Sequence, residues 1–384
     1  MAEGDMDASS KTVEITAQCL CKAHTFSTRV SESSLPLEST ACHCNSCRHA
    51  TGSLCLVSAI WPQPKENVDI GGLKSYQFSA NVTTRFCGTC STPMFYETPG
   101  SPSELGVFTG ALRNIDADLV RITQHIFVGD TLDGGASVWL RKPNPDGKEI
   151  PRYREYSEEI PWSLPEAPAH SSGSDAEEIT ESLPVSCHCK GVQLLFHQGT
   201  YASKKREELP WHIDPRNNKH TATFDACNSC RLQFGTDIVY WTYGELVTIS
   251  QRDGGAFPRT ATELKAAVDA GDAAIGTLTY YRSSPDVQRY FCKVCSASVF
   301  YACDDRPDMV DVGIGLLESP DGARAEKYLS WSFGSPLGYI EDTNGGWREG
   351  LAKRVQAEAE EFRIARGYPK SWRRIQKEAE DASS

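Results

Sequence analysis

The cysteine spacing constrains this chain more than any other feature, because three short cysteine elements follow one another in the same order in both halves. Each half contains a C-x-C pair, then a segment that ends in C-x-x-C, then a C-x-x-C pair that follows a phenylalanine. The neighbouring letters repeat as well, since Cys-Asn-Ser-Cys-Arg occupies residues 44–48 and again residues 227–231. Chance does not account for three matching elements in one order, so the sequence indicates a tandem duplication of one domain.

The first and last cysteine elements of each half combine into a set of four thiols. Two pairs that are far apart in sequence, each with two sulfurs on one side, are typical of a tetrahedral zinc site that clamps distant strands together. The alternative is that these cysteines are small buried hydrophobic residues, but the recurrence of the spacing favours zinc. The expected structural ligands are Cys19, Cys21, Cys87 and Cys90 in the first half and Cys187, Cys189, Cys292 and Cys295 in the second.

The middle element of the first half places the thiols of Cys42, Cys44 and Cys47 on one short segment. Residues i and i+2 of an extended segment point to the same side, and the following x-x-Cys brings a third sulfur onto the same ion. Three ligands leave one corner of the tetrahedron open, as in a catalytic zinc site. Two alternatives stay open: His43 or His49 could complete a closed structural site, or the thiols could remain a reduced cluster.

A zinc site with three thiolates favours thiol chemistry over hydrolysis. Three thiolates leave the site with a net negative charge, so the ion is a weaker Lewis acid than one held by three histidines. Such a site exchanges its fourth ligand readily for another soft thiolate. The expected chemistry is therefore the holding of an incoming thiol as a thiolate beside an electrophile.

The second half departs from this pattern, because Asp225 stands where the first half has Cys42. Asp225, Cys227 and Cys230 remain a possible ligand set, although one oxygen and two sulfurs make a harder and weaker site for zinc. The second cluster is either a degenerate copy with a scaffolding role or a metal site with changed reactivity. We favour the degenerate copy.

Charge and hydropathy argue against several partners. The net charge of -12 and the pI near 5.3 disfavour nucleic acid and anionic membranes, because phosphate binding needs a basic face. No apolar run approaches the roughly 20 residues of a membrane span, and residues 1–11 have neither a basic nor an apolar signal segment. We therefore expect a soluble, cytoplasmic protein, in which clustered cysteines are more often metal ligands than disulfides.

Patterns typical of strands dominate the chain, so we expect a mainly β fold. Alternating or short apolar runs at residues 13–17, 54–61 and 125–128 are typical of strands. The segment at 163–184 is rich in Pro, Ser, Gly and acidic residues, which predicts a linker, and the chain beyond residue 348 has the composition of two helical pieces. The expected parts are a disordered N-terminus at 1–12, a first zinc domain at 13–162, a linker at 163–184, a second, diverged copy at 185–347 and a helical tail at 348–384.

The combined motif resembles the glutathione-dependent formaldehyde-activating family, which also includes centromere protein V. The resemblance rests on C-x-C, then C-H-C-x-x-C-R-x-x-T-G-S, then F-C-x-x-C-S, and it covers residues 13–162 well and 185–347 more loosely. It implies two domains of coiled antiparallel β-sheets and a carbon–sulfur lyase activity, whose type reaction joins glutathione and formaldehyde as S-hydroxymethylglutathione. It also implies a structural zinc on Cys19, Cys21, Cys87 and Cys90 and a catalytic zinc on Cys42, Cys44 and Cys47.

We therefore expect three zinc ions per chain, or four if Asp225 is a ligand, with glutathione as co-substrate and a small electrophile as its partner. Arg48 could bind a carboxylate of glutathione, but it could equally form a salt bridge that supports its loop, as could Arg231. The second copy could close over the first as a lid or complete its pocket. The alternative function is a non-catalytic zinc scaffold that binds a protein, and a closed fourth ligand at Cys42, Cys44 and Cys47 would favour it.

Overall fold

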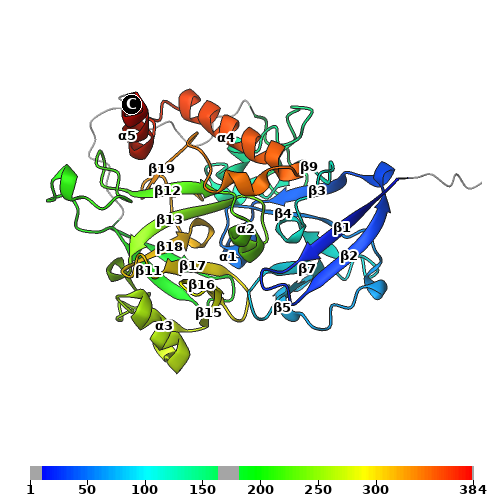
Figure 1. Cartoon of the computed structure of the whole chain (residues 1–384), viewed down its shortest axis with the longest axis horizontal. Helices are drawn as coiled ribbons and strands as arrows, with labels where there is room; N and C mark the ends of the chain where they lie inside the picture. Colours follow the sequence, from blue (N-terminus) through cyan, green and yellow to red (C-terminus); the bar gives the residue numbers. More distant parts are fainter. Residues whose placement is uncertain (1–10, 163–180, 383–384) are drawn as a thin grey trace, which may run out of the picture.

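The computed structural model describes residues 11–162 and 181–382 of the 384-residue chain. These residues form two seven-stranded sheets, two smaller sheets and helices toward the C-terminus, which confirms the expected mainly β fold (Figure 1). Most of the predicted N-terminal tail and linker lies outside the described residues. The first strand of each half begins before the domain start that the sequence predicted. β1 begins at Thr12, one residue before the expected start at 13, and β10 begins at Ser182, three residues before the expected start at 185.

The first half consists of a hairpin and a seven-stranded sheet. The hairpin pairs β1 with β2, and the sheet has the order β5-β6-β7-β8-β4-β3-β9. The elements are β1 (Thr12–Gln18), β2 (Thr25–Ser31), β3 (Leu37–Cys42), α1 (Asn45–Thr51), β4 (Leu56–Ile60), β5 (Lys74–Ser79), β6 (Val82–Phe86), β7 (Pro93–Glu97), β8 (Gly106–Phe108) and β9 (Val120–Ile126).

The second half has a three-stranded sheet, β10-β11-β14, and a seven-stranded sheet with the order β15-β16-β17-β18-β13-β12-β19. Its elements are β10 (Ser182–Ser186), β11 (Gln193–His197), β12 (His220–Asp225), α2 (Asn228–Phe234), β13 (Val239–Glu245), β14 (Ile249–Gln251), α3 (Ala261–Ala270), β15 (Leu278–Ser284), β16 (Val287–Cys292), β17 (Ser298–Cys303), β18 (Met309–Gly313) and β19 (Leu329–Trp331).

The two large sheets have the same strand order when equivalent strands are matched, from β5 and β15 at one edge to β9 and β19 at the other. Both sheets also end in a parallel pair, β3 with β9 and β12 with β19. The sheets are therefore mixed, whereas the sequence resemblance implied antiparallel sheets. A parallel neighbour requires a long crossover, and each half supplies one, because the rest of its sheet lies between the two paired strands in sequence.

The repeated Cys-Asn-Ser-Cys-Arg letters form the start of a short helix in each half. In α1, Cys44 is the N-cap with extended φ and ψ of -61° and 151°, and Gly52 ends the helix in the left-handed region at φ 88°. In α2, Cys227 and Gly235 occupy the same two positions. A β-carbon at Gly52 would lie 2.3 Å from the carbonyl oxygen of Ser298, so glycine also allows the halves to approach closely.

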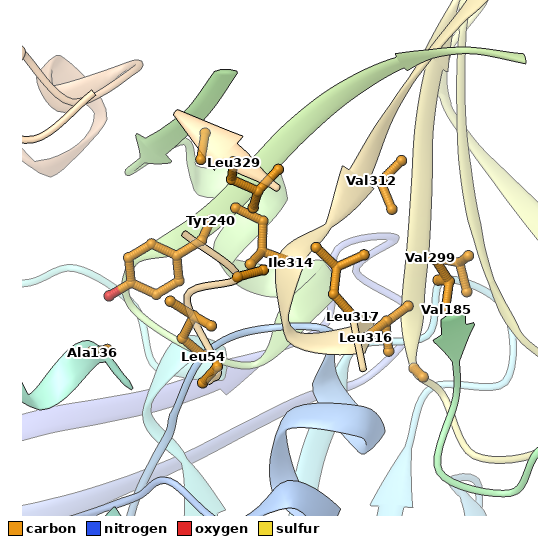
Figure 2. Packing of buried hydrophobic residues seen from close by; sticks show 14 of the residues in the cluster. Leu54, Ala136, Val185, Tyr240, Val299, Val312, Ile314, Leu316, Leu317 and Leu329 are labelled. Atoms are coloured by element: carbon orange, nitrogen blue, oxygen red, sulfur yellow. The ribbon is translucent and has the colours of Figure 1, made fainter. Parts of the chain in front are cut away.

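The halves join through a common core and a reciprocal backbone contact. Figure 2 shows Leu54 and Ala136 of the first half among Tyr240 and Ile314 of the second, all in one buried cluster. The α1 helix packs on the 3-10 helix Ile314–Leu316, and α2 packs on its counterpart Thr109–Ala111. These contacts favour a second half that completes the first over one that closes as a separate lid.

The C-terminal chain forms the helices α4 (Trp347–Ala365) and α5 (Trp372–Asp381), as the composition predicted. The α4 helix contacts both halves, because Arg348 donates to Asp237 of the second half over 2.8 Å and to the Thr109 carbonyl of the first half over 2.6 Å. It crosses the top of both halves in Figure 1. None of the helices among the described residues combines the length and apolar character needed to cross a membrane.

Candidate metal centres and the cavity beside them

The two predicted four-cysteine sets each gather at one point. In each set the four sulfurs lie within 4.8 Å of one another. The first set joins the β1–β2 turn to the β6–β7 turn, with Cys21 Sγ and Cys87 Sγ 3.5 Å apart. The second joins the β10–β11 turn to the β16–β17 turn, with Cys189 Sγ and Cys292 Sγ 3.4 Å apart. Each set therefore ties two distant hairpins together.

The geometry of these sets fits zinc. Zinc binds sulfur at about 2.3 Å, so the sulfurs of a tetrahedral site lie about 3.8 Å apart. Backbone N–H groups also point at the sulfurs, as those of His24 and Val192 donate to Cys19 and Cys187 over 3.3 Å each. Such donors stabilise thiolates. All fifteen cysteines lie among the described residues, and none of them forms a disulfide.

The three thiols of the first-half middle element also converge. Cys42 ends β3, Cys44 caps α1 and Cys47 lies in its first turn, and their sulfurs lie within 4.8 Å of one another. The Cys47 N–H donates to Cys44 Sγ over 3.2 Å. Hydrogen bonds from the thiols of Cys42 and Cys47 lower the pKa of Cys44 to about 3. The start of α1 thus brings the three sulfurs together, and the Cys47 N–H favours the thiolate form of Cys44.

Neither neighbouring histidine joins these three thiols, and no fourth His, Cys, Asp or Glu does so within residues 11–162 and 181–382. His43 is fully buried, and its Nε2 lies 2.9 Å from Nδ1 of His125. His125 Nε2 donates to the Leu140 carbonyl, so His43 is the donor in the pair. His49 Nδ1 donates to the Ser186 carbonyl of the second half over 2.6 Å. Both histidines therefore contribute to packing. A metal ion held by the three thiols would keep its fourth coordination position open to a ligand.

Two tyrosines that the sequence did not single out as site residues lie near this cluster. Burial raises the pKa of Tyr96 and of Tyr156, and the charges of nearby cysteine thiols, Cys42 and Cys47 among them, raise both further. The Tyr96 hydroxyl also accepts a hydrogen bond from Ser58 over 3.4 Å. A signal for Tyr96 was available, because its Phe-Tyr pair recurs at residues 300–301. Tyr156 had none, since the fold alone brings it near the thiols.

Arg48 and Arg231 follow the same repeated letters but have different partners. Arg231 donates to Asn228 and, across the interface, to the carbonyl oxygens of Gly110 and Leu112. Arg48 donates to Asn45, but its buried Nε and Nη1 have no hydrogen-bond partner among the described residues. Neither arginine forms a salt bridge of 4.0 Å or less with a carboxylate in the described part of the chain, so the salt-bridge interpretation is wrong for both.

A cavity of about 630 Å³ adjoins α1 at the junction of the halves. Ser46 and Arg48 of α1 and Asp130 form part of one wall. Second-half residues, among them His188, Lys190, Leu317 and Glu318, form the other. Sequence reasoning could not locate this cavity, because its walls meet only when the two halves pack.

The second-half cluster has the expected members but different surroundings. Asp225, Cys227 and Cys230 place their ligand atoms within 4.8 Å of one another. Burial raises the pKa of Asp225 to about 7, and a hydrogen bond from Cys230 lowers the pKa of Cys227 to about 6. Arg289, which the sequence analysis did not single out, places Nη1 3.5 Å from Cys230 Sγ.

Comparison with known proteins supports the resemblance over the first half. Residues 14–130 match the family described as glutathione-dependent formaldehyde-activating enzyme. The matched residues include the two turns that carry Cys19, Cys21, Cys87 and Cys90, together with Cys42, Cys44 and Cys47. The first half therefore contains a domain of this family. No curated protein and no solved structure matches the chain.

Proposed function

We propose that the protein is a zinc-dependent enzyme of the carbon–sulfur lyase type, which acts on the adduct of glutathione with an aldehyde or a related electrophile. The observation that carries this proposal is the convergence of three thiols without a fourth protein ligand from the described residues. A cavity of about 630 Å³ adjoins the same helix, where Asn45, Ser46 and Arg48 line it, although none of the three cysteines does. A zinc ion bound there would offer its fourth position to the glutathione sulfur and favour its thiolate form at neutral pH. The ligands proposed for it are Cys42, Cys44 and Cys47.

The chain's own residues would prepare the site for this chemistry. The N-terminus of α1 holds Cys44 and Cys47 at fixed positions, and the Cys47 N–H supports the Cys44 thiolate. In the reaction, a sulfur electron pair forms the bond to the aldehyde carbon, and the C=O pair moves to oxygen. The oxygen takes up one proton and the thiol has lost one, so the addition is balanced. Cleavage of the adduct is the reverse.

The cavity suits the rest of the glutathione molecule. Glutathione carries two carboxylates and one ammonium group, and the cavity walls offer groups of both signs, with Arg48 and Lys190 opposite in charge to Asp130 and Glu318. Lys190 and Glu318 pair with each other over 2.8 Å, so that ion pair would have to exchange partners when glutathione binds. Arg48 remains the proposed carboxylate-binding residue, because it lines the cavity and its buried Nε and Nη1 have no hydrogen-bond partner among the described residues. These two nitrogens would have to turn toward the cavity when a carboxylate binds.

Two further zinc ions would have a structural role in the four-cysteine sets, which gives at least three per chain. The alternative function, a zinc scaffold that binds a protein, would not require an open ligand position beside a cavity. A site that binds a thiol substrate does require an open ligand position, and for that reason we favour the enzyme over the scaffold.

The test follows formation of the adduct from glutathione and formaldehyde, with a panel of larger aldehydes in parallel. We expect the zinc-loaded protein to accelerate adduct formation and Cys44→Ala to abolish the acceleration. Cys227→Ala, at the equivalent position of the second half, is the matched control and should keep most of it. A folded, zinc-loaded wild type that neither binds glutathione by calorimetry nor accelerates any adduct would contradict the enzyme and leave the scaffold.

A further inference from the structure

A buried arginine lies inside the second-half cluster. Arg289 in β16 is only 5 % exposed, and its Nη1 lies 3.5 Å from Cys230 Sγ and 3.1 Å from Gln233 Oε1. Its Nε donates to Ser283 Oγ over 2.9 Å, and the Tyr301 ring lies 5.1 Å from the guanidinium carbon. Three separate groups thus hold the cation against a candidate metal ligand.

The first half has no such cation at the equivalent position. Strand register gives the correspondence, because Arg289 pairs with Tyr281 and Tyr301, and Thr84 pairs with Tyr76 and Tyr96 in the first half. Gln233, which holds the guanidinium, likewise stands where α1 has Ala50. The second half has therefore acquired both the cation and the group that positions it.

The third difference is Asp225 itself. Its Oδ1 accepts the Cys227 N–H over 2.8 Å, so one carboxylate oxygen already closes a local turn. In the first half the residue at this position is Cys42, whose sulfur lies 3.5 Å from Cys47 Sγ. The second cluster thus offers one sulfur fewer and an oxygen that is already engaged.

These observations oppose a divalent ion at this place. An arginine keeps its proton in proteins, so its positive charge is permanent. Burial reduces the screening between charges, which strengthens both the attraction of the guanidinium for the thiolates and its repulsion of a metal cation. The guanidinium therefore places a positive charge where a zinc ion, if bound, would place one in the first half.

We propose that Arg289 replaces the metal in the second half, so that Asp225, Cys227 and Cys230 form a metal-free cluster tied to a guanidinium. The chain then carries three zinc ions and not four. The inference concerns metal content alone and does not depend on the proposed enzymatic activity.

The test is elemental analysis of the full-length protein purified without chelator. We expect three zinc ions per chain in the wild type and still three in Cys230→Ser, because Cys230 would bind none. The double variant Asp225→Cys/Arg289→Thr restores the third sulfur and removes the cation, with Gln233 left in place, and should bring the content to four. Arg282→Thr, which removes an arginine from the neighbouring strand β15, is the matched control and should stay at three.

Cobalt substitution gives a second measurement that does not require the double variant to fold. Sulfur-to-cobalt absorption should be the same in wild type and Cys230→Ser, and lower in Cys47→Ser. Four zinc ions in the wild type, with a loss of one in Cys230→Ser, would overturn the proposal.

Discussion

At the scale of single residues, identical residues at equivalent positions make different contacts in the two halves. Arg231 and Arg48 occupy the same position in the repeated segment, and both are buried. Only Arg231 reaches carbonyl groups of the opposite half, those of Gly110 and Leu112. Burial lowers the pKa of both guanidinium groups, so each carries a desolvation cost, but only Arg231 recovers much of it through hydrogen bonds.

This difference predicts unequal costs for the same substitution. Arg231→Gln leaves two interface carbonyls without their charged donor and should lower stability by about 3 kcal/mol. Arg48→Gln removes the local bond to Asn45 and two donors that have no partner among the described residues, so its cost should stay at about 1 kcal/mol, that of one ordinary hydrogen bond. Thermal melts of both variants at matched zinc content measure the difference. Equal losses, or a larger loss for Arg48→Gln, would show that the interface contact of Arg231 is unimportant.

At the scale of elements, cysteines in turns differ from cysteines at a helix start. The first four-cysteine set connects the β1–β2 turn to the β6–β7 turn, so it links the hairpin to the edge of the large sheet. The set of Cys42, Cys44 and Cys47 connects only the end of β3 to the start of α1, which adjoin in sequence. Loss of the first would therefore release distant elements, whereas loss of the second would release a local turn.

We therefore predict different outcomes for one substitution in each set. Cys87→Ser should lower the melting temperature by more than about 10 °C, because a structural zinc site contributes folding free energy directly. Cys47→Ser should change it by less than about 3 °C and still remove glutathione-dependent turnover. Circular dichroism melts, with zinc content measured in parallel, compare the two. If both variants melt alike, the division into structural and catalytic sites is wrong.

At the scale of the whole molecule, the two halves depend on each other. They share a core cluster, in which Trp139 of the first half donates to the Tyr240 hydroxyl of the second over 2.9 Å. A buried polar network also joins them, since Asp237 accepts hydrogen bonds from Thr109 and from Arg348 of α4. Separation would expose this core and break the hydrogen bond from Thr109 to the buried Asp237 carboxylate, and a buried charged group that loses such a partner costs about 1–3 kcal/mol.

The halves should accordingly stay together when the covalent connection is cut. A protease site placed between residues 163 and 180 would allow cleavage of the folded protein. We expect the nicked protein to elute from a sizing column as one particle of unchanged size and to keep its zinc. Two separate particles would show that the connection, and not the interface, holds the halves together. An uncut sample of the same variant is the control.

The cysteine sets could be predicted from sequence because their geometry is mostly local. A C-x-C or C-x-x-C pair brings two sulfurs together through the bond geometry of three or four residues, whatever the surrounding fold. Strand positions were harder to predict. The run at 125–128 predicted a strand, but β9 begins at Val120 and ends at Ile126, because Phe127 adopts a left-handed φ of 55°. The apolar run continues to Val128, so the sequence pattern does not show that the strand ends two residues earlier.

The sequence by itself determined the duplication, the three cysteine elements of each half and the mainly β class, because these follow from repeated letters and short-range periodicity. Only the tertiary structure decided which groups meet across long separations. It placed Arg289 against Cys230, assigned Arg231 to the interface, directed His43 and His49 away from the thiols and formed the cavity between the halves. These contacts depend on strand register and on how two sheets pack, and a change of one residue in register turns a side chain to the opposite face.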